Sequence, residues 1–266
     1  MRYHSYTLAT ATMVSLIAPV LVAAPAHAQL PMPVSEAGPA PLATDAPLQA
    51  GARDTVETGA LVARYGFEDD PEIDDSGHGH TLRIVARHRG TVRATPHDTG
   101  RAMAFPAKCR GGRCPQVVLQ TRSAEALNPG SLPLAFGATV LLTPTQTSKG
   151  QNIVQKGYSR TSSQYKLQID GAAGRPSCVL VDVLRPRIRM VRSRMSVADG
   201  QWHTLECQRR GRWLQIIVDG VVQGRRHVPA TLAIANWCPL SIGGKGAYND
   251  NDQFHGSVDD VWVRIG

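Results

Sequence analysis

The sequence lacks the patterns that mark the common enzyme and membrane classes. It contains neither a G-x-S-x-G nucleophile turn nor a phosphate-binding P-loop. After residue 28 no apolar run approaches the 20 or so residues that a membrane-spanning helix needs. Between residues 130 and 220 no two acids lie two or four residues apart, so no strand there presents a carboxylate pair on one face. We therefore expect no catalytic residues and no membrane span.

The sequence is also poor in lysine, although its formal net charge is +8. Only five of the 29 basic residues are lysines, so arginine supplies nearly all of the positive charge. A basic exported protein favours acidic polymers such as anionic glycans or nucleic acid. Nucleic acid is not expected here, because the basic segments lack interleaved aromatic residues and the chain carries an export signal.

The first 54 residues do not have the composition of a folded domain. Residues 1–28 combine Arg2, the apolar run MVSLIAPVLVAA and the sequence AHA, which is typical of a cleaved signal peptide. Residues 29–54 are rich in proline and alanine and predict a disordered linker. Residues 55–266 are then long enough for one domain with its own core, on a secreted, extracellular protein.

The apolar pattern of this domain alternates with a period of two and is interrupted by Gly, Pro, Asn and Asp. This pattern predicts an all-β, antiparallel two-sheet jelly-roll sandwich with about twelve strands. The segment 177–191 is predicted to bend at Pro186 or to lie on an edge. The dipeptide Asp219-Gly220 predicts a two-residue hairpin turn. Expected strands are 61–67, 80–87, 102–106, 116–121, 134–144, 151–157, 164–170, 177–191, 201–211, 212–224, 239–244 and 256–266.

Five cysteines in an exported chain indicate disulfides. Cys109 and Cys114 enclose the flexible segment RGGR and can meet. Cys178 and Cys207 lie in strand-like segments and could bridge neighbouring strands. Cys238 is then left unpaired, although it could replace either partner of the first pair.

The last strand places a carboxylate at the head of an apolar row. Asp259 precedes Val261, Val263 and Ile265 on the face predicted to point into the core. A buried carboxylate without a partner would cost several kcal/mol. Asp259 therefore needs a partner.

Three segments together resemble the laminin G-like, concanavalin A-like lectin/glucanase superfamily. They are VADGQWHTLECQRRGRWLQIIVDGVVQG in the middle, LVARYGFEDD with DDSGHGHTLRI at the start, and LSIGGKGAYNDNDQFHGSVDDVWV at the end. The resemblance covers roughly residues 58–266. It implies a jelly roll whose first and last strands are neighbours. The Glu-x-Asp-x-Glu run of the glucanase branch is missing, which disfavours an enzyme.

The resemblance also implies a structural calcium ion where the opening loop meets the last strand. Calcium takes six to eight oxygen ligands from carboxylates and carbonyls. The expected side-chain ligands are Asp259 and Asp75, with Glu68 and Asp74 as further candidates. The alternative is that these acids form solvated turns and that backbone N–H groups hold Asp259.

A row of arginines is the strongest candidate for ligand binding. Arg185, Arg187 and Arg189 would lie on one face of an extended segment, about 6.6–6.8 Å apart. Such a row suits the carboxylates or sulfates of a polysaccharide, although it also suits a solvated outer strand protected from edge pairing. Further ligand-binding candidates are Trp237, Asn251 and Asp252.

We expect a secreted, non-catalytic and lectin-like module that binds a glycan or an anionic polysaccharide. The alternative is an extracellular adhesion or structural protein that binds another protein. A glycoside hydrolase is the third possibility, and fold alone does not decide among these functions.

Overall fold

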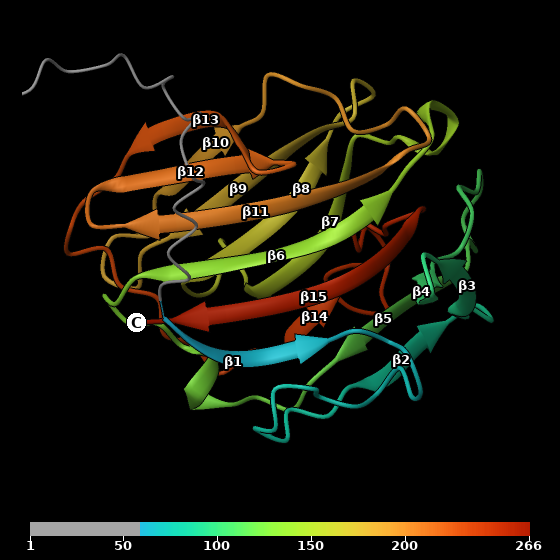
Figure 1. The fold of residues 1–266 in the computed structure, drawn as a ribbon, viewed down its shortest axis with the longest axis horizontal. Helices are drawn as coiled ribbons and strands as arrows, with labels where there is room; N and C mark the ends of the chain where they lie inside the picture. Colours follow the sequence, from blue (N-terminus) through green and yellow to red (C-terminus); the bar gives the residue numbers. More distant parts are fainter. Residues whose placement is uncertain (1–58) are drawn as a thin grey trace, which may run out of the picture. The chain divides into compact units, whose positions relative to one another are not determined.

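A computed structural model describes residues 59–266, which belong to one compact unit. The predicted signal peptide (residues 1–28) and linker (residues 29–54) lie outside the described residues. Two antiparallel sheets are stacked face to face as a sandwich (Figure 1). Within residues 59–266 the helices are two 3₁₀ turns, η1 (Glu125–Leu127) and η2 (Pro144–Gln146), and none is long and apolar enough to cross a membrane.

The two sheets have eight and seven strands. Sheet A has the order β13-β12-β11-β6-β15-β4-β3, and β1 pairs with β15 outside this path. Sheet B has the order β10-β9-β8-β7-β14-β5-β2. The bounds are β1 Ala60–Tyr65, β2 Arg83–Arg87, β3 Arg93–His97, β4 Gly100–Ala104, β5 Gln116–Gln120, β6 Leu134–Leu141, β7 Gly150–Gly157, β8 Gln164–Asp170, β9 Arg175–Val181, β10 Ile188–Arg192, β11 Trp202–Arg210, β12 Trp213–Val218, β13 Val221–His227, β14 Leu240–Ile242 and β15 Ser257–Ile265.

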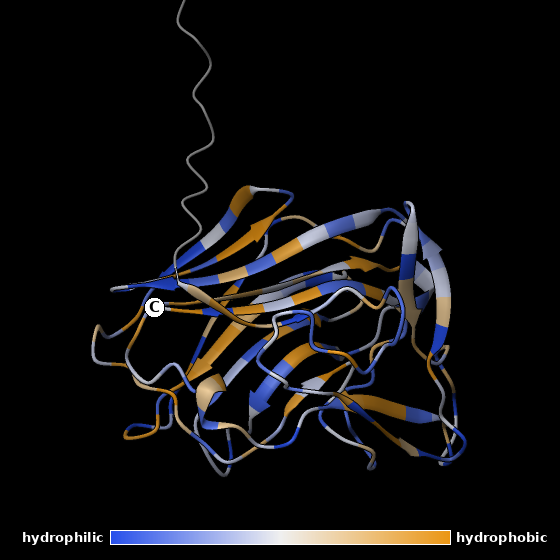
Figure 2. Cartoon of the chain, turned by 60° about the horizontal axis from the view of Figure 1, so that its bottom comes forward, coloured by the Kyte–Doolittle hydropathy of each residue, from blue (hydrophilic) through white to orange (hydrophobic). Residues whose placement is uncertain are grey.

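The core lies between the sheets and follows from the alternation in the sequence. Polar and apolar residues take turns along the strands (Figure 2), so each strand directs one row of side chains inward. Phe136 of sheet A and Tyr165 of sheet B meet in this core with ring centroids 5.0 Å apart, and both are fully buried. The predicted all-β jelly-roll sandwich is confirmed.

The first and last strands are neighbours, as expected. β1 pairs antiparallel with β15, with Tyr65 opposite Val261. Three strand predictions differ from the structure. The expected strand 212–224 is two strands, β12 and β13, separated by the turn at Asp219-Gly220. β3 was not among the expected strands. It contains Pro96, which an edge strand tolerates since its outer side needs no N–H donor. The segment 177–191 is two strands, β9 and β10, joined by a connection that contains Pro186. The predicted edge position is correct for β10, which is the outer strand of sheet B.

The described chain contains two disulfides and one free cysteine. Cys109–Cys114 closes a short surface loop, and Cys178–Cys207 has a Cα–Cα distance of 5.5 Å. The second bond joins β9 of sheet B to β11 of sheet A, so it crosses the core instead of linking neighbouring strands as predicted. Cys238 is unpaired. The predicted turn at Asp219-Gly220 is confirmed, because both residues have positive φ between β12 and β13.

Candidate functional site

The opening loop, residues 68–75, carries the acids that were predicted to bind calcium. Asp74 Oδ1 accepts hydrogen bonds from the N–H groups of Arg64 (3.1 Å) and Ser76 (3.0 Å). Ser76 Oγ donates to the same oxygen at 2.6 Å, and the His80 N–H donates to Oδ2 at 2.8 Å. Burial alone would raise the pKa of Asp74, but these four donors outweigh it and lower the pKa below its usual value.

Two other acids of the opening loop accept backbone hydrogen bonds in the same way. Asp75 Oδ2 accepts the N–H of Gly66 at 2.7 Å. Glu68 Oε2 accepts the N–H of Arg101, the second residue of β4, at 3.1 Å. The carboxylates of the loop therefore satisfy backbone donors that would otherwise need water.

Asp259 is buried at the head of its apolar row, as predicted, and its partner is an imidazole. His97 Nδ1 of β3 contacts Asp259 Oδ2, and the Asp260 N–H donates to Oδ1 at 2.7 Å. Burial raises the pKa of Asp259, and the His97 hydrogen bond offsets this only in part. The His97 ring also lies against Trp202, with centroids 3.9 Å apart.

This arrangement does not fit the predicted calcium site. The carboxylates of Asp74, Asp75 and Asp259 already accept hydrogen bonds from N–H or O–H donors of the chain. A calcium ion could bind these oxygens only by displacing those donors. Among residues 59–266 no group of three or more His, Cys, Asp or Glu side chains is placed to hold a metal ion. The geometry matches the alternative, turns held by backbone N–H groups, except that an imidazole is the main partner of Asp259.

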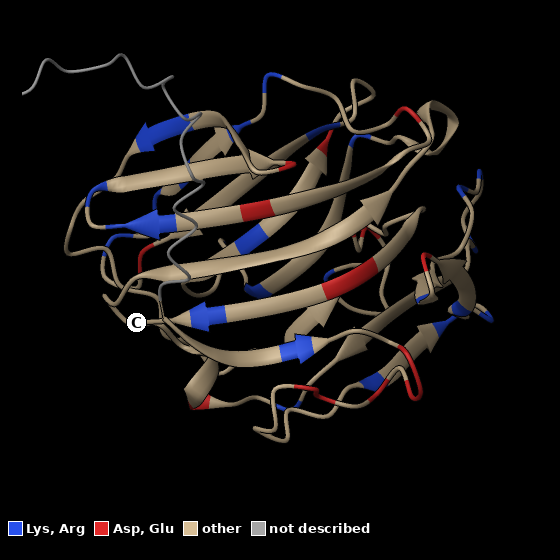
Figure 3. Cartoon of the chain, in the orientation of Figure 1, with Lys and Arg blue, Asp and Glu red and all other residues tan. Residues whose placement is uncertain are grey.

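The arginines gather where the outer strands of the two sheets meet. β10 ends sheet B, β13 ends sheet A, and the two strands are in contact. Arg226 Nη1 of β13 donates to the Met190 carbonyl of β10 at 3.0 Å. We call this surface the basic edge (Figure 3). Its arginines are Arg185, Arg187, Arg189, Arg192, Arg225 and Arg226.

The guanidinium groups of the basic edge are largely without protein partners. Within the described part of the chain, none of the six forms an ion pair with an acid. Arg226 has the carbonyl contact above, and Arg225 lies over the Trp213 ring, 4.2 Å from its centroid. These cations are therefore available to a ligand without the loss of an internal salt bridge.

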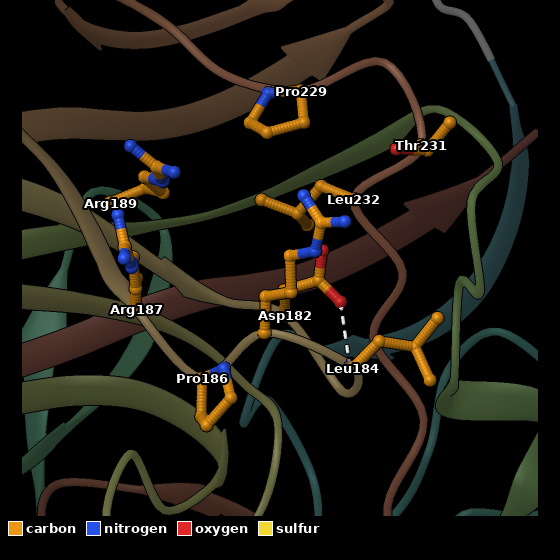
Figure 4. A pocket seen from close by; sticks show the side chains of 9 residues that line it. Asp182, Leu184, Pro186, Arg187, Arg189, Pro229, Thr231 and Leu232 are labelled. Atoms are coloured by element: carbon orange, nitrogen blue, oxygen red, sulfur yellow. Dashed lines mark hydrogen bonds between the residues drawn. The ribbon is translucent and has the colours of Figure 1, made fainter.

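A cavity of about 750 Å³ opens at the basic edge. One wall is the β9–β10 connection with the start of β10, and the opposite wall is the segment that follows β13 (Figure 4). The lining residues are Asp182, Leu184, Arg185, Pro186, Arg187, Arg189, Pro229, Thr231 and Leu232. Asp182 is the single acid among them, and its Oδ1 accepts the Leu184 N–H at 2.8 Å.

A buried arginine anchors the second wall. Arg209 of β11 is 3% exposed, and its Nη2 donates to the carbonyls of Leu232 (2.6 Å) and Ala230 (3.3 Å). Its Nη1 donates to the carbonyls of Ser131 (2.7 Å) and Leu132 (2.6 Å). One guanidinium thus fixes two connections against each other, and the wall has a defined shape before any ligand arrives.

The three arginines of the predicted row do lie together, but they do not form the regular row of one extended strand. β10 begins at Ile188, so Arg185 and Arg187 lie in the connection and only Arg189 lies in the strand. The backbone turns between them, since the Arg187 N–H donates to the Arg185 carbonyl at 2.6 Å. The regular spacing of a strand is therefore absent. Nevertheless, all three side chains line the same cavity.

The remaining candidates lie outside this cavity. Trp237 is 83% exposed, as expected for an aromatic in a surface loop. Asn251 is 3% exposed, and its Nδ2 donates to Gln253 Oε1 at 3.2 Å. Asp252 pairs with Lys245 at 2.6 Å. The last two residues therefore hold their own loop together.

The site residues missed in the sequence analysis come close to their partners only in the folded chain. His97 is 162 positions from Asp259, and no local pattern connects the two. Arg225 and Arg226 join the β10 side only because β13 ends the other sheet. Their adjacency in the sequence was a visible signal of positive charge, but not of its position.

With the sandwich and its edge described, the chain can be compared with known proteins. Two stacked antiparallel sheets of this topology define the class of jelly-roll sandwiches. The family model of the concanavalin A-like lectin/glucanases superfamily (Laminin_G_3) matches residues 125–264, and the chain belongs to this family. No curated protein sequence matches the chain.

Several solved structures share the fold. Domain 4 of AbnA, a GH43 extracellular arabinanase from Geobacillus stearothermophilus, in complex with arabinotriose, aligns with a TM-score of 0.60 at 16% identity, over 78% of this chain and 93% of that one. The binding domain of Paraclostridial Mosquitocidal Protein 1 aligns with a TM-score of 0.60 at 12% identity, over 77% and 48%. The binding domain of botulinum neurotoxin DC, in complex with SialylT, aligns with a TM-score of 0.56 at 10% identity, over 80% and 48%. The chain thus spans about half the length of these toxin domains, and identities this low show the fold alone.

Proposed function

We propose that this chain is a secreted, non-catalytic binding module and that its basic edge holds an anionic polysaccharide. The observation that carries the proposal is that Arg185, Arg187 and Arg189, which have no acidic partner in the described chain, line one cavity. The other arginines of the basic edge lie on the outer strands beside it. A guanidinium presents paired N–H donors that match a carboxylate or sulfate in a bidentate manner. The similar structures solved with arabinotriose and with SialylT support a saccharide ligand by analogy.

The cavity combines charge with an apolar surface. Leu184, Pro186 and Pro229 line it beside the arginines. The apolar faces of a sugar ring can pack on such side chains while its acidic groups pair with the guanidinium groups. A uronic acid or sulfated sugar offers both features.

Secretion and the absence of catalysis are parts of the same proposal. The signal-like residues 1–28 and the two disulfides are typical of an exported protein. A usual glycosidase places two carboxylates around the scissile bond. The cavity holds one acid, Asp182, which is already bonded to the Leu184 N–H.

An adhesion or structural protein that binds another protein is the second candidate. Leu184 is 82% exposed and Ile188 is 57% exposed, both beside the arginines of the basic edge. An exposed apolar side chain within a charged rim is also what a protein partner would cover. This candidate predicts that an apolar substitution such as Leu184→Ser affects binding more than the loss of any one arginine.

A glycan array at about 150 and about 500 mM salt tests the proposal, because exposed charge pairs weaken as salt screens them. We expect signals on carboxylated and sulfated glycans at the lower salt, strongly reduced at the higher salt. Absence of signal on every glycan would overturn the saccharide proposal and favour the protein partner. Neutral glycans that give the same signal as anionic glycans at both salt concentrations would show that the charge of the basic edge does not determine binding.

A further inference from the structure

A second group of unpartnered arginines lies on the opposite side of the sandwich. There β2 ends sheet B, β3 ends sheet A, and the loop closed by Cys109–Cys114 precedes β5, the neighbour of β2. We call this surface the distal edge. Its arginines, all exposed, are Arg83, Arg87, Arg89, Arg93, Arg110 and Arg113. From residue 83 to residue 113 the sequence contains eight basic residues and one acid, Asp98.

These arginines have no acidic partner in the described chain. No side-chain hydrogen bond or ion pair joins any of the six to another residue among residues 59–266. The opening loop is the nearest acidic segment in the sequence. However, its carboxylates Glu68, Asp74 and Asp75 accept backbone N–H groups, as described above.

A disulfide bond and hydrogen bonds order the loops of the distal edge. The disulfide ties Cys109 to Cys114 around Arg110 and Arg113. His88 Nδ1 contacts the Cys114 carbonyl at 3.1 Å, which joins the turn after β2 to the disulfide loop. In that turn His88 and Arg89 have positive φ, and the Gly90 N–H donates to the Arg87 carbonyl at 3.0 Å, as in a type I′ turn.

Gly90 fixes the turn against the strand that follows the disulfide loop. A Cβ at position 90 would lie 2.0 Å from the Gln116 carbonyl oxygen, so the turn approaches β5 as closely as a backbone can. Arg89, Arg110 and Arg113 are therefore carried by loops that are already ordered. A ligand at this edge has less backbone entropy to remove than it would at free loops.

The two edges are far apart on the same sheet. β10 and β2 are the two outer strands of sheet B, with five strands between them. Six inter-strand spacings of about 4.8 Å place them roughly 29 Å apart. Figure 3 shows basic residues on both sides of the molecule. A short oligosaccharide can therefore contact one edge or the other, but not both.

We infer that the distal edge is a second anion-binding surface and that one domain bridges two segments of an anionic polysaccharide. This inference rests on the proposed function, because the ligand chemistry is the same: carboxylates or sulfates along a polymer, paired with guanidinium groups. It adds a second site and a consequence, the crosslinking of polymer chains by a single protein molecule.

The test is a calorimetric titration of the full chain with a heparin tetrasaccharide at low salt, followed by turbidity with full-length heparin. We expect two tetrasaccharides per chain and a turbid mixture with the polymer. The distal variant R89Q/R110Q/R113Q should bind one tetrasaccharide and stay clear. The basic-edge variant R185Q/R187Q/R189Q, which removes the same charge, should also bind one and stay clear. The control R160Q removes an exposed arginine of the β7–β8 connection, which belongs to neither edge, and should behave as the parent does.

The possible failures are distinguishable. One tetrasaccharide per chain, lost only in the basic-edge variant, overturns the second site and leaves the proposed function standing. If the parent binds one tetrasaccharide per chain and only the distal variant loses it, the ligand does not bind at the basic edge. That result overturns both the role of the basic edge and the bridging of two polymer segments. No binding by the parent chain overturns both. Equal melting temperatures of all variants, measured first, ensure that a lost site is not a lost fold.

Discussion

The acidic opening loop and the basic edge differ in where their hydrogen bonds go. In the opening loop Asp74 alone accepts four donors, and Asp75 and Glu68 each accept a backbone N–H. At the basic edge Arg185, Arg187 and Arg189 have no acidic partner in the described chain. Both regions looked like ligand sites in the sequence, because each concentrates one sign of charge.

The difference shows that charge density alone does not identify a binding site. A carboxylate that accepts several backbone N–H groups contributes to the fold, and a ligand would have to compete with those donors. A guanidinium with only water around it contributes little to stability and can pair with a ligand at low cost. Substitutions in the two regions should therefore affect different properties.

Asp74→Asn should produce the largest effect. The amide replaces one accepting oxygen with a donor that faces the same N–H groups, so we expect the free energy of unfolding to fall by about 2–3 kcal/mol at neutral pH. Urea denaturation of parent and variant measures this. Binding at the basic edge should be unchanged at temperatures where the variant is folded. An unchanged unfolding midpoint would mean that the opening loop does not depend on this carboxylate.

The triple variant R185Q/R187Q/R189Q should show the reverse behaviour. Affinity for a carboxylated or sulfated polysaccharide should fall roughly tenfold or more, since each exposed ion pair contributes about 0.5–1 kcal/mol. The melting temperature should remain that of the parent. Titration calorimetry and thermal denaturation give the two values. Full affinity in this variant would place the ligand elsewhere.

The stability difference between the parent and Asp74→Asn should depend on pH. The pKa of Asp74 is lowered in the folded chain from its ordinary value of 3.8. Its contribution is therefore complete above the unfolded value and is lost as the pH falls through the folded value. We expect denaturation curves of the two proteins to differ fully at pH 7 and to converge at acid pH. A constant difference would indicate that the ionised carboxylate is not the form that matters.

Calcium should have the smallest effect. The oxygens of Asp74 and the partners of Asp259 are already supplied by the chain. The melting temperature should thus be the same in calcium and in a chelator. A ligand that binds the folded form must raise the melting temperature, so a clear increase in calcium would restore the original prediction.

Much of the fold could be predicted from local patterns. The period-two alternation gave the sandwich, and the last strand placed Asp259 inside it. The short spacing of Cys109 and Cys114 indicated the first disulfide, and the dipeptide Asp219-Gly220 indicated its turn. The pairing of Cys178 with Cys207 was expected from their strand-like segments, although not across the core. Each of these depends on neighbours in sequence or on a strong residue preference.

The site was less predictable, because its contacts are set by the sheet order. No short pattern connects His97 to Asp259, or β10 to β13. The hydrogen bonds of the opening loop could not be predicted for a different reason. The donors of Asp74 are mostly backbone N–H groups, which every residue type except proline carries, so the sequence shows the acceptor but not its partners.

The anchoring of one cavity wall by Arg209 has a consequence for how this domain could change its preference among ligands. The segment around Leu232 is tied to the interior, so a substitution there would disturb the whole sandwich. In the facing connection, the Val183 N–H donates to the Ala233 carbonyl at 2.9 Å and Asp182 Oδ1 accepts the Leu184 N–H, but residues 183–187 are exposed. Relatives with other specificities should accordingly keep the arginine of β11 and diversify in length and composition between β9 and β10.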